Sequence, residues 1–422
     1  MKKKWLILLV TVFLITTLTV ACGTPTTQTA PAVQTAPAAQ TAPAAQTTPA
    51  AQTTPATQTS LAAPTTLAVP TTPAVPTTPA PQTTPAVQTT PTPAQPKTFT
   101  FKDSLGRSVV VPTNITKVAL SGPLAQIVLF ALCPDKLVGV ANAWDPSAKE
   151  FLKIEHFNLP LLGQLYGGRG TLNLETIAAT GAQVIIDVGE RKDNMVADLD
   201  NLQAQLKIPV VHIEAYTRNM GDCYRKLGEL LNMTKEAEIL ARYCDDIYAR
   251  TLDVANQVGD KGKVRMLYIT GDKGLNVIAK SSFHAEIIDL LANNLAVVQN
   301  PSSKGTGNEV DLEQIMVWNP DVILFAPGSI YSTVGTNQDW STISAIKNKK
   351  YYEVPFGPYN WMGFPPSVQR YLGMLWMANL LYPDVAKYNL FHEVSAYYKL
   401  FYHTDITQEQ YNKLVANSIG KR

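Results

Sequence analysis

The hydrophobic positions of the chain fall into short apolar runs that alternate with segments of helical periodicity. Six such runs are three or four residues long, at 118–120, 184–186, 210–213, 266–269, 322–324 and 351–354. Short runs of apolar residues are typical of buried parallel strands. Strands that alternate with helices predict an α/β fold built on parallel sheets.

An internal repeat divides these runs into two groups. The sequence Asn-Leu-Glu-x-Ile begins at Asn173, the sequence Asp-Leu-Glu-x-Ile begins at Asp311, and in both the interval from Glu to the next apolar run is nine residues. Asn173 and Asp311 are expected to cap short helices, with Glu175 and Glu313 in the first turn, where the helix dipole favours a negative charge. The repeat therefore predicts two α/β lobes of similar construction.

Residues 234–258 lie between the two groups and have the periodicity of one long helix. Thr234 is expected to cap its start, and Gly259 is expected to end it. At about 1.5 Å per residue the helix would span roughly 35 Å, the width of a lobe, so it is expected to join the two halves. The apolar positions at helical spacing are Ala237, Leu240, Cys244, Ile247 and Leu252.

The N-terminus has the pattern of an export signal. Three lysines precede an uncharged apolar run at residues 5–20, and a small residue precedes Cys22. This arrangement resembles a bacterial lipoprotein signal, in which the thiol of Cys22 would carry acyl chains that hold the protein on a membrane. The alternative is a signal peptide that is cut nearby without lipidation.

A long uncharged tract follows the leader. There is no Asp, Glu, Lys or Arg between Lys4 and Lys97, and 16 of the 30 prolines lie between Cys22 and Lys97. Such a sequence has nothing to bury, so we expect a disordered, polyproline-II-biased Thr/Pro/Ala/Gln linker of the kind that carries a protein through a Gram-positive cell wall. The predicted organisation is a signal peptide at 1–21, the linker at 22–97, an N-terminal α/β lobe at 98–233, a connecting helix at 234–258 and a C-terminal α/β lobe at 259–422.

Charge and hydropathy exclude two classes of protein. The 422 residues include 35 Lys+Arg and 33 Asp+Glu, and removal of the three leader lysines leaves 32 positive against 33 negative residues. A chain so close to neutral has no electrostatic footprint for nucleic acid. Apart from residues 5–20, the apolar groups are too short for transmembrane helices, which excludes a transmembrane bundle.

The order of these motifs resembles a known family. The chain is similar to the substrate-binding proteins of ABC transporters, in the class III periplasmic binding protein family that carries ferric siderophores, haem and cobalamin. The resemblance covers about residues 99–415. Besides the two repeats, the segments that carry it are 101–112, 283–288, 319–323 and 340–347.

The resemblance implies two lobes that are joined by one long helix, hinge little and hold a ligand in the cleft between them. It also implies that Glu175 and Glu313 dock the protein onto arginines of the permease. The alternative for both residues is that they are only first-turn helix charges.

Candidate ligand-binding residues follow the strands, because ligands of open parallel sheets lie beyond the carboxyl ends of the strands. Tyr359 and Trp361 could stack on a flat chelate, or either could pack into its lobe. Arg169, in a Gly-rich loop, or Arg191 could pair with an anionic group, although an arginine in such a loop is more often solvated. The expected ligand-binding residues are Tyr166, Arg169, Glu190, Arg191, Tyr216, Tyr331, Tyr359 and Trp361.

Neither metal ligation nor catalysis has a recognisable motif in the sequence. The five histidines share no metal-ligand spacing, and there is no nucleophile elbow and no P-loop. Cys133, Cys223 and Cys244 are expected to pack as small apolar residues. The alternatives to a receptor are a surface-anchored sensor or a hydrolase with a similar fold.

We therefore expect a lipid-anchored, monomeric solute receptor that is not an enzyme and has no cofactor of its own. It would lie on the outer face of the cytoplasmic membrane, bind a metal chelate and pass it to an ABC permease and its ATPase. A ferric siderophore is the first expectation for the chelate, and haem or a corrinoid comes next.

Overall fold

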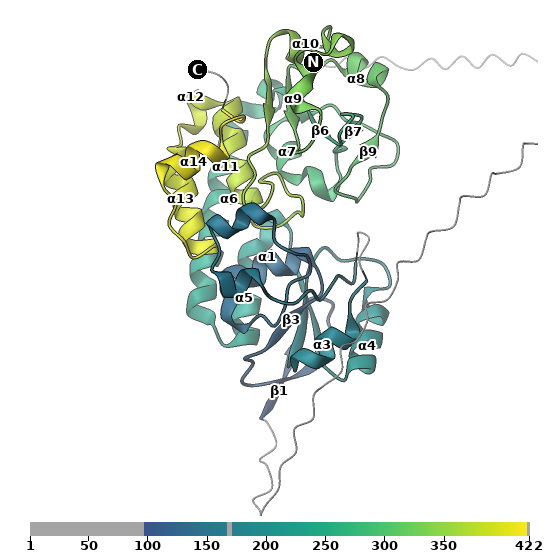
Figure 1. Ribbon diagram of the computed structural model, residues 1–422, viewed down its shortest axis with the longest axis vertical. Helices are drawn as coiled ribbons and strands as arrows, with labels where there is room; N and C mark the ends of the chain where they lie inside the picture. Colours follow the sequence, from purple (N-terminus) through teal and green to yellow (C-terminus); the bar gives the residue numbers. More distant parts are fainter. Residues whose placement is uncertain (1–96, 167–170, 420–422) are drawn as a thin grey trace, which may run out of the picture. The chain divides into compact units, whose positions relative to one another are not determined.

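The structure is a computed structural model that describes residues 97–166 and 171–419, all of which belong to one compact unit. The predicted signal peptide, Cys22, all but the last residue of the predicted linker, and Arg169 lie outside the described residues. Figure 1 shows the strands of the two lobes in separate regions of the ribbon, with α6 and the C-terminal helices together along one side.

The first lobe contains a three-stranded parallel sheet in the order β3-β4-β5. Its strands are Val118–Leu120, Val184–Gly189 and Val210–Glu214, and all but Glu214 are buried. Strands β1 (Thr98–Lys102) and β2 (Ser108–Pro112) form a separate antiparallel hairpin. The helices are α1 (Pro123–Leu132), α2 (Ile154–Phe157), α3 (Leu174–Thr180), α4 (Met195–Leu206) and α5 (Met220–Leu231).

The sheet of the second lobe is mixed, whereas the sequence pattern predicted a parallel one. Parallel pairs join four of its strands: β6 (Arg265–Thr270), β8 (Asn293–Asn294), β10 (Val322–Phe325) and β11 (Tyr351–Glu353). Strand β7 (Asn276–Val277) pairs antiparallel with β6, and β9 (Asn308–Glu309) pairs antiparallel with β7. The tight connection from β6 to β7 explains the difference. Gly271 and Gly274 have positive φ values of 79° and 69°, and so short a turn can join only antiparallel strands.

The remaining elements of the second lobe are short helices beside this sheet. They are α7 (Glu286–Leu291), α8 (Leu312–Trp318), α9 (Tyr331–Val334) and α10 (Ser344–Lys347).

The internal repeat is present in three dimensions at α3 and α8. Asn173 accepts a hydrogen bond from the Thr176 amide at 2.9 Å, and Asp311 accepts one from the Gln314 amide at 2.7 Å, which confirms both predicted N-caps. The C-terminal ends correspond as well. The Lys117 ammonium donates to the Thr180 carbonyl, and the Arg265 guanidinium donates to the Trp318 carbonyl.

The long helix α6 spans Thr234–Gly262 and is interrupted at Gly259, whose φ of 64° and ψ of 164° are not helical. The cap position is Met233, without a side-chain cap, so the prediction of Thr234 as the N-cap was wrong. Leu252 is 39 % exposed, which corrects its assignment to the buried face. Thr251, Val254 and Ala255 take that role, while the four preceding apolar positions are buried as predicted.

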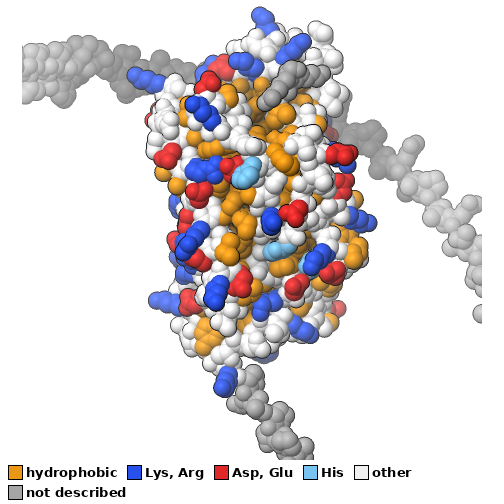
Figure 2. Space-filling model, turned by 90° about the vertical axis from the view of Figure 1, so that its left-hand side faces the viewer, with side chains coloured by type: hydrophobic (Ala, Val, Ile, Leu, Met, Phe, Trp, Pro, Cys, Tyr) orange, Lys and Arg blue, Asp and Glu red, His pale blue; other side chains and the backbone are white. Residues whose placement is uncertain are grey.

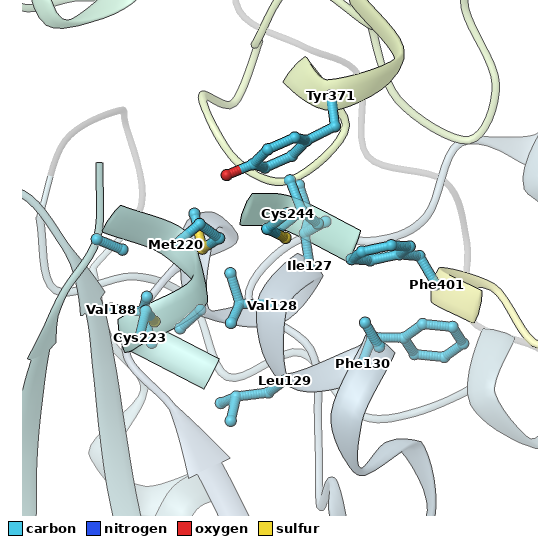
Figure 3. Close-up of a cluster of buried hydrophobic side chains, with 14 of the residues drawn as sticks. Ile127, Val128, Leu129, Phe130, Val188, Met220, Cys223, Cys244, Tyr371 and Phe401 are labelled. Atoms are coloured by element: carbon cyan, nitrogen blue, oxygen red, sulfur yellow. The ribbon is translucent and has the colours of Figure 1, made fainter. Parts of the chain in front are cut away.

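The C-terminal helices extend the core of the first lobe. They are α11 (Arg370–Leu381), α12 (Pro383–Ala386), α13 (Leu390–Phe401) and α14 (Gln408–Leu414). Figure 3 shows side chains of α1, α5, α6, α11 and α13 in one buried cluster, among them Phe130, Tyr371 and Phe401. A second cluster lies on the other face of the second sheet, around Phe325 and Trp340.

The three cysteines of the described residues are free and buried, as expected. Cys244 lies in the cluster of Figure 3 with Cys223. Burial raises the pKa of the Cys133 thiol to about 12, so this thiol stays protonated and unreactive at neutral pH.

Acidic and basic side chains are interspersed over the face shown in Figure 2, in keeping with the formal net charge of only +2 for the chain. Among the residues that the structure describes, no helix has both the length and the apolar character needed to cross a bilayer.

Candidate functional site

A buried polar bridge connects the two lobes where β5 leads into α5. The hydroxyl of Thr217, from the first lobe, donates to Glu286 Oε2 of the second lobe at 2.8 Å. The Arg370 guanidinium donates to the same carboxylate oxygen at 2.6 Å and to the Phe283 carbonyl at 2.6 Å. Tyr371 adds a hydrogen bond from its hydroxyl to the Thr217 carbonyl at 2.7 Å. Glu286, Arg370 and Tyr371 thus each form a hydrogen bond with this one threonine of the first lobe.

Arg370 is only 1 % exposed. Desolvation lowers the pKa of its guanidinium to about 10, although Glu286 opposes this shift. The group therefore stays protonated at neutral pH, and its charge is matched by that of Glu286. A buried charge needs such a partner, because an unpaired one is strongly destabilising.

Tyr216 and Arg218, on either side of Thr217, lie at the edge of this bridge. The Tyr216 ring meets the Phe283 ring of the second lobe edge-on at 5.6 Å, and the Arg218 guanidinium lies 4.3 Å from the Tyr216 ring centroid. Arg218 is also 3.9 Å from Glu286 Oε1, and its side chain is 59 % exposed. The pKa of the Tyr216 hydroxyl is raised, chiefly by burial and to a lesser extent by the nearby carboxylates of Glu214 and Glu190. The predicted residue Tyr216 is therefore part of the wall between the lobes.

The loop at residues 356–364, after β11, presents different aromatic residues from those predicted. Phe356 is 37 % exposed and Phe364 is 56 % exposed, whereas Trp361 is 1 % exposed and lies in the main core. Tyr359 packs 5.5 Å from Trp144 and accepts a hydrogen bond from Gln126 at 2.8 Å. The prediction that Tyr359 and Trp361 offer open stacking faces was wrong.

The reason is that this loop is tied to both lobes. Tyr359 inserts into the first lobe, while the Asn360 amide donates to the Tyr268 hydroxyl of β6 at 2.9 Å. Asn360 also forms isolated bridges with Phe356 and with Phe364. The central residues of the loop are thereby drawn inward, and the two phenylalanines at its ends are left facing solvent.

Phe364 lies close to the interlobe bridge. A Cβ atom added at Gly305 would come within 2.2 Å of the Phe364 ring and 3.0 Å of His284, so the glycine allows both side chains to approach. The His284 ring contacts the Gly363 carbonyl at 3.3 Å. Burial and then Arg370 lower the pKa of His284 to about 4, which keeps this imidazole neutral at physiological pH.

The other predicted residues lie in three different environments. The Tyr166 hydroxyl donates to Asp198 at 3.2 Å, and Lys192 lies 5.5 Å from the Tyr166 ring and 3.5 Å from Glu190. Glu190 is half-buried. Tyr166 and Glu190 are therefore linked through Lys192. Arg191 is exposed, with no ion pair recorded among the described residues.

Tyr331 does not join these residues. Its ring packs on Phe325 and Tyr351, and its hydroxyl donates to the Asn417 carbonyl at 3.3 Å. The ring therefore belongs to the outer core of the second lobe, which corrects its assignment as a ligand contact.

Sequence reasoning missed the residues of the interlobe bridge and both exposed phenylalanines. Glu286 lies in the 283–288 segment used for the family resemblance, but nothing in the sequence marks its contact with Thr217, 69 residues away. The burial of Arg370 was not predictable from the sequence, because an arginine at the start of an apolar helix is usually a surface residue.

A buried chain of three polar residues lies inside the first lobe. The Ser121 hydroxyl donates to Asp187, and Asp187 Oδ2 lies 2.7 Å from His212 Nδ1. All three residues are at most 5 % exposed. The carboxylate stands between the hydroxyl and the imidazole, whereas nucleophilic catalysis needs the imidazole next to the hydroxyl.

Glu175 and Glu313 occupy equivalent positions in the first turns of α3 and α8, and both are exposed. No ion pair is recorded for either carboxylate within the described ranges. Among residues 97–166 and 171–419, no group of three or more His, Cys, Asp or Glu side chains is arranged to hold a metal ion.

The chain is similar to several known proteins. The family model described as periplasmic binding protein matches residues 118–357. The chain is 24 % identical over 330 residues to the molybdate-binding protein MolA of Haemophilus influenzae, covering 72 % of this chain and 90 % of the relative. It is 23 % identical over 297 residues to the uncharacterized ABC transporter substrate-binding lipoprotein YvrC of Bacillus subtilis, covering 68 % and 87 %. A solved ABC transporter solute binding protein from Sulfurospirillum deleyianum has a TM-score of 0.69 and 29 % identity, covering 75 % of this chain and 99 % of the other.

Proposed function

Because the chain belongs to the periplasmic binding protein family, as a solute-binding protein of an ABC transporter, we propose that its solute is an organic metal chelate. The chelate is captured outside the cytoplasmic membrane and delivered to the permease and ATPase of an importer. It binds between the lobes, against the wall that contains Tyr216, Arg218 and Phe364. A ferric siderophore is the first candidate, and haem or a corrinoid follows.

The observation that carries this proposal is the exposed aromatic surface of the wall. Phe364 is 56 % exposed beside the interlobe bridge, and Tyr216 presents a half-buried ring under Arg218. Binding sites for organic ligands are lined by apolar and aromatic side chains with a few polar groups that fix orientation. A small inorganic anion gains no favourable contact from an exposed phenyl ring. The organic groups of a chelate would pack against the ring and remove it from water.

The charges around Tyr216 narrow the class of chelate. Glu190, Glu214 and Glu286 all act on the Tyr216 hydroxyl, and Arg218 is the cation among the groups that do so. A wall of this composition favours a chelate of low net charge over a strongly anionic one.

Molybdate is the second candidate, and the similarity to a molybdate-binding protein favours it. The wall offers Arg218 to an oxyanion, and two further cations, the exposed Arg191 and Lys192 beside Glu190, follow β4. The three carboxylates oppose this reading, because they repel a small dianion at close range.

The two candidates are separated by a fluorescence titration of the purified protein. Ferric hydroxamate and ferric catecholate complexes, haemin, cyanocobalamin and sodium molybdate are added in turn while tryptophan emission is followed. Saturable quenching by one chelate at micromolar concentration or below supports the proposal. Saturation by molybdate alone selects the second candidate, and no response to any of the five overturns both.

Docking to the permease is proposed for Glu175 and Glu313. Both are exposed at matching positions of the two repeat helices, where they can meet arginines of a partner without first breaking an internal ion pair. Glu175→Arg combined with Glu313→Arg is expected to abolish uptake and leave solute binding unchanged. Normal uptake in this double variant would leave both residues as ordinary first-turn helix charges.

Anchoring is proposed at Cys22, after cleavage of the leader. A lipid chain there would hold the protein on the outer face of the membrane, with residues 22–97 as the linker. Cys22→Ala is expected to move the protein from the membrane fraction into the medium. Retention of this variant in the membrane fraction would contradict the anchor.

A further inference from the structure

The two repeat helices are matched in construction at both of their ends. Each begins with an Asx cap and carries an exposed glutamate in its first turn. Each ends with a carbonyl that accepts from a basic side chain at the start of the neighbouring strand, Lys117 for α3 and Arg265 for α8. Positions at the same distance from the glutamate are therefore structurally equivalent.

The exposed faces of the two helices differ at two equivalent positions. Three and four residues after Glu175 come Ala178 and Ala179, both exposed. Three and four residues after Glu313 come Met316, which is 36 % exposed, and Val317, which is 78 % exposed. Residues at these spacings share a helix face with the glutamate. The second lobe therefore carries an apolar pair beside its proposed docking residue, and the first lobe does not.

Val317 has the largest exposed fraction among the large hydrophobic side chains of the described residues. A single exposed apolar residue needs no explanation. Here two apolar residues adjoin a carboxylate without a recorded ion pair, and the equivalent face of the other lobe shows that the fold itself requires only alanines there.

We propose that Glu313, Met316 and Val317 form an asymmetric docking patch for the permease. The inference rests on the proposed function. Its partner is an extracytoplasmic segment of the permease in which a basic side chain lies next to an apolar one, so that the cation meets Glu313 and the apolar group covers Met316 and Val317. Removal of these side chains from water strengthens the contact at the second lobe alone. The patch thereby makes the contact at the second lobe stronger than the contact at the first.

The test replaces the pair by the residues of the other lobe. Met316→Ala with Val317→Ala gives α8 the surface of α3, and alanine is the best helix former, so the fold is kept. Binding to the cognate permease–ATPase complex, reconstituted in lipid nanodiscs, is measured by surface plasmon resonance. We expect at least a tenfold weaker Kd, with an unchanged solute titration. The matched control is Ile239→Ala on α6, which removes a side chain that is 57 % exposed and is expected to leave the Kd unchanged.

Three outcomes overturn the inference. The first is a double variant that binds the complex as tightly as the unmodified protein, and the second is an equal loss in the Ile239→Ala control. The third is an equal loss of binding to empty nanodiscs, which would make the patch a lipid contact. If the unmodified protein binds neither the complex nor any solute, the proposed function fails together with the patch, whereas the first two outcomes remove the patch alone.

Discussion

The sheets of the two lobes differ in how their faces are buried. Both faces of the first-lobe sheet belong to one core, which continues into α1, α6, α11 and α13. The second-lobe sheet is divided, because Met266 and Tyr268 of β6 point into that shared core while Leu267 and Ile269 point into a separate one with Trp340. The first lobe, the long helix and the C-terminal helices therefore form one packed body, and the outer face of the second lobe is a module of its own.

This difference shows which parts of the molecule can hold the proposed solute site in a fixed geometry. Thr217, Glu286 and Arg370 connect the shared body to the second lobe through part-buried hydrogen bonds, and the loop at 356–364 connects them again through Tyr359 and Asn360. A site built between two such connections is largely preformed, which reduces the ordering cost of binding.

The largest expected effect comes from removing a buried tryptophan from each core. Trp361→Ala and Trp340→Ala should each lower the free energy of unfolding by about 3–5 kcal/mol, because a large cavity is left behind. Amide hydrogen exchange should then distinguish the two variants. Trp361→Ala is expected to speed exchange in both lobes, and Trp340→Ala is expected to speed it in β6, β10 and β11 while α1 and α6 stay protected. Identical exchange maps would show that the two cores do not behave separately.

Acid should weaken the connection between the lobes through His284. The pKa of this buried imidazole is about 4 in the folded protein, against an ordinary value of 6.5, so the unfolded chain binds the proton more readily. The stabilisation is complete above pH 6.5 and is lost as the pH falls towards 4, with a total of about 3 kcal/mol. Urea denaturation across this range should show the loss, and His284→Gln should remove most of the slope. An unchanged slope in the variant would assign the acid sensitivity to other groups.

Loss of the interlobe hydroxyl should have a smaller effect on stability. Thr217→Val removes the donor to Glu286 and should cost about 1–3 kcal/mol, because a half-buried carboxylate oxygen loses a partner. Thr251→Val is the matched control, since that hydroxyl is also buried but donates only to the Ile247 carbonyl of its own helix. Solute affinity should fall with Thr217→Val and stay constant with Thr251→Val. Equal solute affinities in the two variants would show that the bridge does not contribute to the solute site.

The Phe364→Ala variant is expected to change stability least of all, and yet to weaken chelate binding clearly. Phe364→Ala removes an exposed ring, so the free energy of unfolding should change by less than about 0.5 kcal/mol. Affinity for the bound chelate should fall about tenfold, since the ring would be covered by the ligand. Val110→Ala, which truncates a side chain 57 % exposed on the β2 hairpin strand, serves as the control and should bind normally. Unaltered binding by the Phe364→Ala variant would move the site away from this loop.

The elements that depend on local pattern were predictable from the sequence. The strands around Val184 and Val322 and the caps at Asn173 and Asp311 follow from apolar runs and residue spacing, and the structure confirms them. The hairpin geometry of β7 depends on positive φ values at Gly271 and Gly274, which the pattern of hydrophobic residues does not encode.

The composition of the wall depends on long-range contacts and was predicted less well. Tyr359 was placed in the cleft because it follows a strand, but Gln126, 233 residues away in the sequence, draws it into the first lobe. Tyr216 lies at the end of β5, as the strand pattern predicted, and its role in ligand binding stays a prediction. In an irregular loop such as 356–364 no periodicity shows which aromatic faces outward, so the exposure of Phe356 and Phe364 became known only from the structure.

The most direct test of the account is amide hydrogen exchange with and without the chelate that quenches fluorescence. A chelate bound against the interlobe wall should slow exchange at residues 216–218, 283–286 and 356–364 together, because these three segments form the wall from both lobes. Protection confined to a single lobe, or located elsewhere in the described chain, would contradict the proposed site.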